Sequence, residues 1–150
     1  MGNPHQFAYW FQAEQLRLQR TELALQRESS ARDTITSLRT LHMELLSLSL
    51  GDSDLLEVWP TSNMRAERRK QFVYVNLILQ HHWLALRAGD ASTEEVEASL
   101  FYLFDSPIFR EYWQSKDERM RSTPSGSEES RFFQLVDKTY IAATQGRADQ

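Results

Sequence analysis

Cysteine is absent from this 150-residue chain, and glycine and proline are scarce, with five and four residues. Without cysteine the chain has no disulfide, no thiolate nucleophile and no cysteine-ligated metal centre. Turn residues are too few for a fold of many β-hairpins, so helix is expected. The lack of cysteine also suits a reducing compartment, and we therefore expect a cytoplasmic protein.

A long apolar run is missing as well. The most apolar stretch, residues 72–79, is far shorter than the about 20 residues that cross a bilayer, and the start of the chain does not read as a secretory signal. The 17 basic and 21 acidic residues give a net charge of −4, which disfavours binding to the phosphates of nucleic acid. We expect a protein that neither spans a membrane nor binds nucleic acid.

Apolar residues recur at helical spacing through most of the sequence. Residues 5–29 predict a first helix, and a second stripe, with spacings of three, four and three, is expected to face the core: Leu38, Leu41, Leu45 and Leu48. Because the two stripes do not join, we expect either a bend or break near Ser29 and Ser30 or a helix that changes its packing partners there. Gly51 is expected to end this region with a left-handed turn.

Capping residues, glycines and prolines predict the later helices. A short helix over 55–59 should be closed by Pro60, and a central buried helix should run over roughly 64–88 and end at Gly89. Two helices begin at Ser92 and Ser106, and a last one over roughly 128–144 ends at Gly146. Residues 120–130 read as a loop, and three tryptophans are expected in the core: Trp59, Trp83 and Trp113.

These signals together predict an all-α protein, an irregular bundle of about six helices with a long N-terminal helical arm. The arm is assigned to residues 1–30, because its apolar stripe differs from the stripe that follows. A helical core domain over 31–145 and a C-terminal tail over 146–150 complete the expected organisation.

Four motifs in a fixed order resemble a known family: Leu55-Leu56-x-Val58-Trp59, Arg69-x-x-Phe72-x-Tyr74-x-Asn76-Leu77, Phe104-x-Ser106-Pro107-x-x-Arg110-x-x-Trp113 and Phe132-x-x-Leu135-Val136-Asp137. Over residues 35–140 the chain is similar to small helical proteins of actinobacteria known only as a domain of unknown function. The resemblance implies a helical fold and brings no catalytic residue. Some similar proteins begin with a membrane-spanning segment, whereas this chain begins with an aromatic amphipathic helix.

Residues with catalytic or metal-binding chemistry are sparse. His81 and His82 are adjacent, so on a helix they point about 100° apart and cannot share one metal without help from His42, Glu44 or another helix. The sequence contains no Glu-x-x-His, no His-Glu-x-x-His, no Gly-rich phosphate loop and no Gly-x-Ser-x-Gly. We expect no metal, no cofactor and no catalytic residue, and hence a non-enzymatic protein.

Two polar clusters each leave a functional and a structural interpretation open. The first is either an anion-binding patch or a solvated face neutralised by Glu67 or the acidic segment 52–57: Arg65, Arg68, Arg69 and Lys70. The second lies on the central helix and could line a ligand pocket: Tyr74, Asn76 and His81. Its structural interpretation is that the amide of Asn76 satisfies a nearby carbonyl group.

A cluster of four aromatic residues near the start of the chain is the most informative feature: Phe7, Tyr9, Trp10 and Phe11. Four aromatics in five positions surround more of a helix than one packing face, so part of the cluster should contact a partner or a membrane surface. The alternative is that the helix folds back on its own core.

The leading hypothesis is therefore an interaction protein that self-associates, as a homodimer, through this N-terminal aromatic helix. The second hypothesis is a small-ligand-binding or accessory helical protein of a bacterial pathway, with the pocket near Tyr74, Asn76 and His81.

Overall fold

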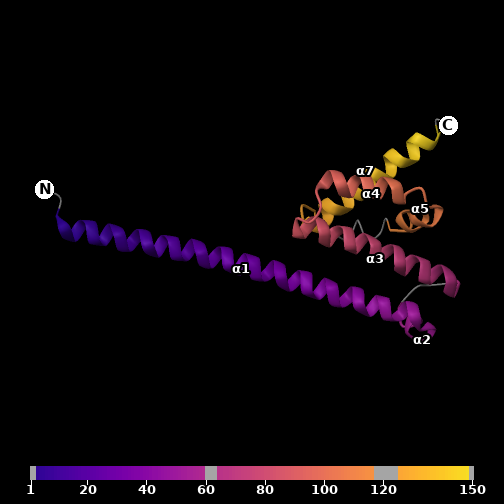
Figure 1. Ribbon diagram of the computed structural model, residues 1–150, viewed down its shortest axis with the longest axis horizontal. Coiled ribbons are helices and arrows are strands. Elements are labelled where there is room, and N and C mark those ends of the chain that lie inside the picture. Colours follow the sequence, from indigo (N-terminus) through magenta and orange to yellow (C-terminus); the bar gives the residue numbers. More distant parts are fainter. Residues whose placement is uncertain (1–2, 60–63, 117–124, 149–150) are drawn as a thin grey trace. The chain divides into compact units, whose positions relative to one another are not determined.

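The computed structural model describes residues 3–59, 64–116 and 125–148, and within these ranges every regular element is an α-helix (Figure 1). Six helices are present there, which confirms the all-α class expected from the sequence. The chain divides into two compact units, residues 1–41 and residues 42–150, and each is described by itself.

Helix α1 (Pro4–Gly51) is uninterrupted, so of the alternatives at Ser30 the break is wrong and the continuous helix agrees with the structure. No glycine or proline stands between its first and last residues to interrupt the hydrogen-bond ladder. The hydroxyl of Thr34 donates to the carbonyl oxygen of Ser30 at 2.9 Å, so local polar side chains are satisfied within the helix. The helix does end at Gly51, but without the left-handed turn expected there.

The second apolar stripe does not face the core, which corrects the expectation from its spacing. Its four leucines are exposed by 61, 55, 57 and 63%: Leu38, Leu41, Leu45 and Leu48. The buried residues of α1 are instead Leu46, exposed by 3%, and Ser49, whose hydroxyl donates to the carbonyl oxygen of Leu46 at 2.6 Å. Periodicity shows that a helix has an apolar face, but not which face the rest of the chain covers.

Helix α2 (Ser53–Leu56) is a single turn that starts at Asp52, whose carboxylate accepts a hydrogen bond from the backbone N–H of Asp54 at 2.9 Å. It packs with the end of α1 and with one side of the next helix. The resulting small core, which we call the minor cluster, consists of Leu46, Leu56, Val73 and Leu77.

Helix α3 (Ala66–Ala88) is buried on two sides, as its apolar composition predicts. Val73 and Leu77 enter the minor cluster, while Val75, Leu79 and Trp83 enter a larger one, which we call the major cluster. Gly89 ends the helix with φ 77°, and this left-handed cap confirms the expected boundary.

Helices α4 (Thr93–Leu103) and α5 (Pro107–Gln114) begin at the predicted serines. The hydroxyl of Ser92 accepts from the N–H of Glu95 at 3.2 Å, and that of Ser106 accepts from the N–H of Phe109 at 3.4 Å. Both helices contribute to the major cluster, which α7 completes: Val75, Leu79, Trp83, Val96, Leu100, Phe104, Phe109, Tyr112, Trp113, Phe132, Val136 and Ala143.

Helix α7 (Glu128–Ala148) continues through Gly146, so the predicted end at that glycine is wrong. The reason is a contact beyond the local sequence. Arg147, in the last turn, donates from Nη1 to the carbonyl oxygen of Phe104 at 2.7 Å and forms an ion pair with Asp105. These bonds to the end of α4 stabilise the last turn against the helix-weakening effect of glycine.

Two of the sequence predictions lie outside the described residues: the closing role of Pro60, and residues 120–124 of the loop expected over 120–130. Of the rest of that range, residues 125–127 form a turn in which Gly126 has φ 82°, a conformation that suits glycine, and residues 128–130 belong to α7.

Two of the three tryptophans expected in the core are fully buried. Trp83 is exposed by 7% and Trp113 by 4%, whereas Trp59 is only half-buried against the minor cluster. Replacing Trp83 with alanine should lower the free energy of unfolding by about 3–5 kcal/mol, because it empties a large site in the major cluster. Urea denaturation followed by circular dichroism measures this; an unchanged midpoint would contradict the central place of α3.

Neighbouring leucines test which face of α1 is covered. Leu46→Ala should cost about 2–5 kcal/mol, whereas Leu45→Ala, at a side chain exposed by 57%, should change stability by less than about 0.5 kcal/mol. Both variants remove the same atoms one position apart, so each is the other's control. Equal losses in thermal stability would show that the second stripe is covered after all.

Candidate functional site

The first turns of α1 carry a patch of uncovered aromatic side chains, which we call the aromatic patch. Its members are exposed by 69, 73, 63 and 51%: Phe7, Tyr9, Trp10 and Phe11. The rings of Phe7 and Trp10 lie 6.2 Å apart between centroids, tilted by 36°, so they contact each other but leave most of their surface in water. The sequence interpretation of this cluster as surplus aromatic surface agrees with these exposures.

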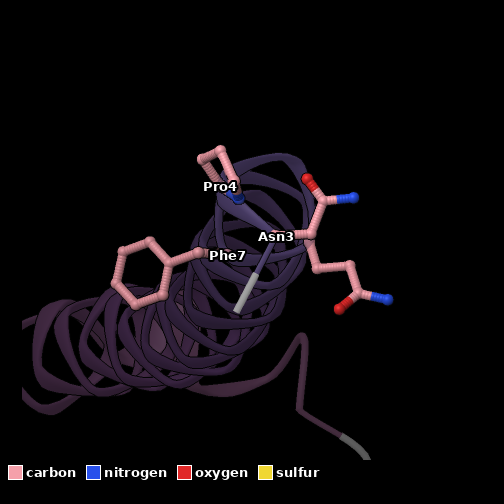
Figure 2. A pocket seen from close by; sticks show the side chains of 4 residues that line it. Asn3, Pro4 and Phe7 are labelled. Atoms are coloured by element: carbon pink, nitrogen blue, oxygen red, sulfur yellow. The ribbon is translucent and has the colours of Figure 1, made fainter. Parts of the chain in front are cut away.

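A depression in the surface lies at the very start of α1. It is lined by Asn3, Pro4, Gln6 and Phe7. Figure 2 shows that the ring of Phe7 and the amide of Asn3 extend to opposite sides of the helix start. The four side chains therefore form an open edge beside the aromatic patch, and they do not enclose a ligand.

Charged residues follow the aromatic patch along α1, and some of them pair within the helix. Arg17 donates from Nε to the carboxylate of Glu14 at 3.0 Å, and this hydrogen bond holds the pKa of Glu14 below its usual value. Arg32 pairs with Glu28 at 3.1 Å. Among the described residues no ion pair is formed by three further charges of this helix: Arg20, Glu22 and Arg27.

His81 and His82 lie side by side on α3 with ring centroids 5.6 Å apart. His81 is exposed, whereas His82 is half-buried and its Nε2 has no hydrogen-bond partner in the described chain. Burial lowers the pKa of His82, and the neighbouring His81 lowers it further. Over the described residues no three His, Asp or Glu side chains gather in a way that could hold a metal ion.

The three residues of the hypothetical ligand pocket do not lie together on α3. Tyr74 and His81, seven positions apart, are both exposed on one side of the helix. Asn76 points elsewhere and accepts a hydrogen bond from the side-chain amide of Gln80 at 3.2 Å. The side-chain oxygen of Asn76 is thus satisfied one turn along its own helix.

Two of the four basic residues at the start of α3 form ion pairs with carboxylates of the same chain. Arg68 pairs with Glu111 at 2.8 Å and lies over the ring of Phe72, while Arg69 pairs with Glu57 and donates to the carbonyl oxygen of Met64 at 3.0 Å. Arg65 and Lys70 remain exposed. Two of the four members of the hypothetical anion patch are therefore neutralised within the chain.

Sequence reasoning missed two exposed leucines on α1. Leu16 and Leu23 are exposed by 55 and 51% and stand at seven-residue spacing from Tyr9, which the heptad period of a helix face would have revealed.

The described helices define an all-α protein that exposes apolar helix faces on α1. None of these helices is both long enough and apolar enough to cross a membrane. The chain belongs to the Family of unknown function (DUF6082), which it matches over residues 7–150. No curated protein and no solved structure matches it. The family match agrees with the resemblance seen in the sequence motifs and extends it to nearly the whole chain.

The half-buried His82 predicts a pH-dependent stability. Because its pKa is lower in the folded chain, the unfolded chain binds this proton first as the pH falls. Stability should be complete above the ordinary histidine pKa of about 6.5 and should decrease below it. His82→Gln should flatten this decrease in denaturation experiments between about pH 7 and pH 5, and His5→Gln, at an exposed site, is the control. An identical pH profile for His82→Gln and the wild-type chain would contradict the assignment.

Proposed function

We propose that this protein is a non-enzymatic interaction protein that self-associates through its N-terminal aromatic helix. The observation that carries the proposal is the exposure of the aromatic patch, of which Tyr9 is exposed by 73% and Trp10 by 63%. Large aromatic side chains left in water on one short stretch of helix are typical of surfaces that bind another protein.

The energetic argument rests on the area that a partner would cover. Burying one side chain of the size of Phe or Trp contributes roughly 1.5–3 kcal/mol. Micromolar affinity corresponds to about 8 kcal/mol, so the aromatic patch reaches this affinity only if a partner covers nearly all four of its side chains. Part of this gain is lost to the restriction of the two partners. The aromatic patch therefore supports moderate affinity, and other exposed residues of α1 have to add to it.

Charged side chains of both signs follow the aromatic patch on α1, with Arg20, Glu22 and Arg27 unpaired among the described residues. Exposed charges contribute little affinity, but they discriminate between orientations of two helices. A helix that combines an apolar surface with such charges is suited to specific association with one partner orientation.

The ligand-binding hypothesis gains no supporting observation from the described residues. Tyr74 and His81 face solvent, and Asn76 is hydrogen-bonded to Gln80. The cytoplasmic location and the actinobacterial origin stay part of the proposal; the first is supported by the cysteine-free composition, and the second by the motif resemblance alone.

Sedimentation velocity of the full chain over a range of concentrations tests the proposal. The double variant Trp10→Ala/Phe11→Ala should weaken self-association at least about a hundredfold, because each truncation removes an anchor worth roughly 1.5–3 kcal/mol. The matched control is Phe101→Ala/Tyr102→Ala, which removes two adjacent aromatics of α4 with similar exposure, 50 and 75%. A wild-type chain that stays monomeric at the highest concentration rules out self-association.

A further inference from the structure

Six exposed apolar side chains of the first unit lie on one side of α1, which we call the contact side. At about 100° per residue they fall within an arc of about 120°. This arc includes three of the four members of the aromatic patch, whereas Tyr9 points to the far side of the helix. The six side chains are exposed by 69, 63, 51, 56, 61 and 44%: Phe7, Trp10, Phe11, Leu18, Leu25 and Ile35.

Four charged residues lie within the same arc. Glu14 and Arg32 stand 18 residues apart, which is five full turns, so both occupy the middle of the contact side. Arg17 and Glu28 stand closer to one edge of it. Within the chain Arg17 pairs with Glu14, and Arg32 pairs with Glu28 at 3.1 Å. The contact side therefore carries two intrahelical ion pairs among its apolar residues, each with the acidic residue first.

We propose that the contact side binds the contact side of a second copy of this chain, with the two helices antiparallel and the twofold axis between Glu22 and Leu23. The inference rests on the proposed function, self-association through α1, and deepens it by naming the contact face and the orientation. In such a pair two residues lie opposite each other when their numbers add up to about 45, because the chains run in opposite directions at the same rise per residue.

The order of the charges favours this orientation. An antiparallel pair brings the same edge of both helices together, so Glu14 meets Arg32 of the second copy and Arg17 meets its Glu28. The two intrahelical pairs thus join into a group of four alternating charges, which the twofold axis repeats. In a parallel, in-register pair each residue in the middle of the face meets its own copy. Glu14 would then lie against Glu14, and Arg32 against Arg32, which is repulsive.

The apolar residues of the contact side are complementary in the same arrangement. Trp10, on the edge that carries Arg17, meets Ile35 of the second copy. Next to the twofold axis, Leu18 lies within one helical turn of Leu25 of the second copy, and the symmetry repeats this contact. The pairing therefore covers Ile35, which stands far from the aromatic patch along α1, together with the aromatic anchors of the proposed function.

The uncovered area of the contact side is sufficient for a specific interface. Each of its six apolar side chains leaves about 100 Å² in water, so a symmetric pair would bury about 1,200 Å², the lower end of the range for stable protein interfaces. The exposed charges add little affinity to this apolar contact, but they discriminate between the two orientations.

Disulfide crosslinking of the full chain tests the orientation, because the wild-type chain has no cysteine. In a mixture of Glu14→Cys and Arg32→Cys chains under mild oxidation, mixed covalent dimers should form at least about tenfold faster than dimers of either variant with itself. The reason is that a disulfide requires Cα atoms within about 7 Å. Mass spectrometry distinguishes the three dimers. The matched control is a mixture of Arg20→Cys and Arg27→Cys chains, which stand at opposing levels of the same pair but on the far side of α1, and which should crosslink slowly.

The outcomes separate this inference from the proposed function. Faster formation of Glu14→Cys dimers than of mixed dimers would overturn the antiparallel orientation, while self-association through α1 would stand. The contact side would be overturned if the control mixture crosslinked as fast as the test mixture, or if a self-associating chain crosslinked slowly in both mixtures. A wild-type chain that is monomeric by sedimentation at the same concentration would overturn the proposed function and this inference together.

A single charge next to the twofold axis gives an independent test of orientation. Glu22 stands at the other edge of the contact side, so in the antiparallel pair it faces its own copy. Glu22→Gln should therefore strengthen self-association by about two- to fivefold in sedimentation velocity, because it removes a like-charge contact at an exposed site. In a parallel pair Glu22 would instead meet Arg17 of the second copy, five residues earlier, and the substitution would weaken self-association. Unchanged or weaker association of Glu22→Gln would contradict the antiparallel pair.

Discussion

The burial of α3 from two sides is the constraint on which the second unit depends. Its residues Val75, Leu79 and Trp83 join α4, α5 and α7 in the major cluster, and Val73 and Leu77 join α2 and the end of α1 in the minor cluster. A helix in this position has to be apolar on most of its circumference, and only a narrow strip that includes Tyr74 and His81 stays in water. Both cores are therefore lost together if α3 is displaced.

Arginines complete this unit by satisfying backbone and carboxylate groups within the chain. The carbonyl oxygen of Phe104, at the end of α4, accepts from Arg110 at 2.6 Å and from Arg147 at 2.7 Å, so cations cap the negative end of that helix. Arg87 pairs with Glu128 at the start of α7 and lies over the ring of Trp83. Since Arg68 and Arg69 are committed in a similar way, much of the positive charge of this unit serves its own folding and not a ligand.

The first unit differs from the second, because its apolar side chains do not pack against other parts of the same unit. A helix gains most of its stability in a protein from packing an amphipathic face, and the exposed side chains of α1 supply such faces without a partner element. This is the physical ground on which we propose association as the function of the protein.

Features that depend on groups within a few residues of one another could be predicted from the sequence. The caps at Ser92 and Ser106 and the left-handed Gly89 involve hydrogen bonds or backbone angles set by adjacent positions, and all of them are where local chemistry predicts. The short helix expected over 55–59 instead spans Ser53–Leu56. The aromatic patch was equally accessible, since four large rings in five positions cannot share one packing face. The exposed residues Leu16 and Leu23 could have been found from their seven-residue spacing to Tyr9.

Tertiary packing alone decided the rest. Gly146 stays helical because Arg147 reaches the end of α4, 43 positions earlier in the sequence, which no local pattern reveals. Leu45 and Leu46 are equally apolar and equally helical, yet only Leu46 is buried, because α2 and α3 cover one side of α1 and not the other. Helix formation is governed by neighbours along the chain, and the sequence by itself therefore determined an all-α protein and most of its helix boundaries. The choice between two apolar faces depends on groups far apart in the sequence, and only the folded chain made it.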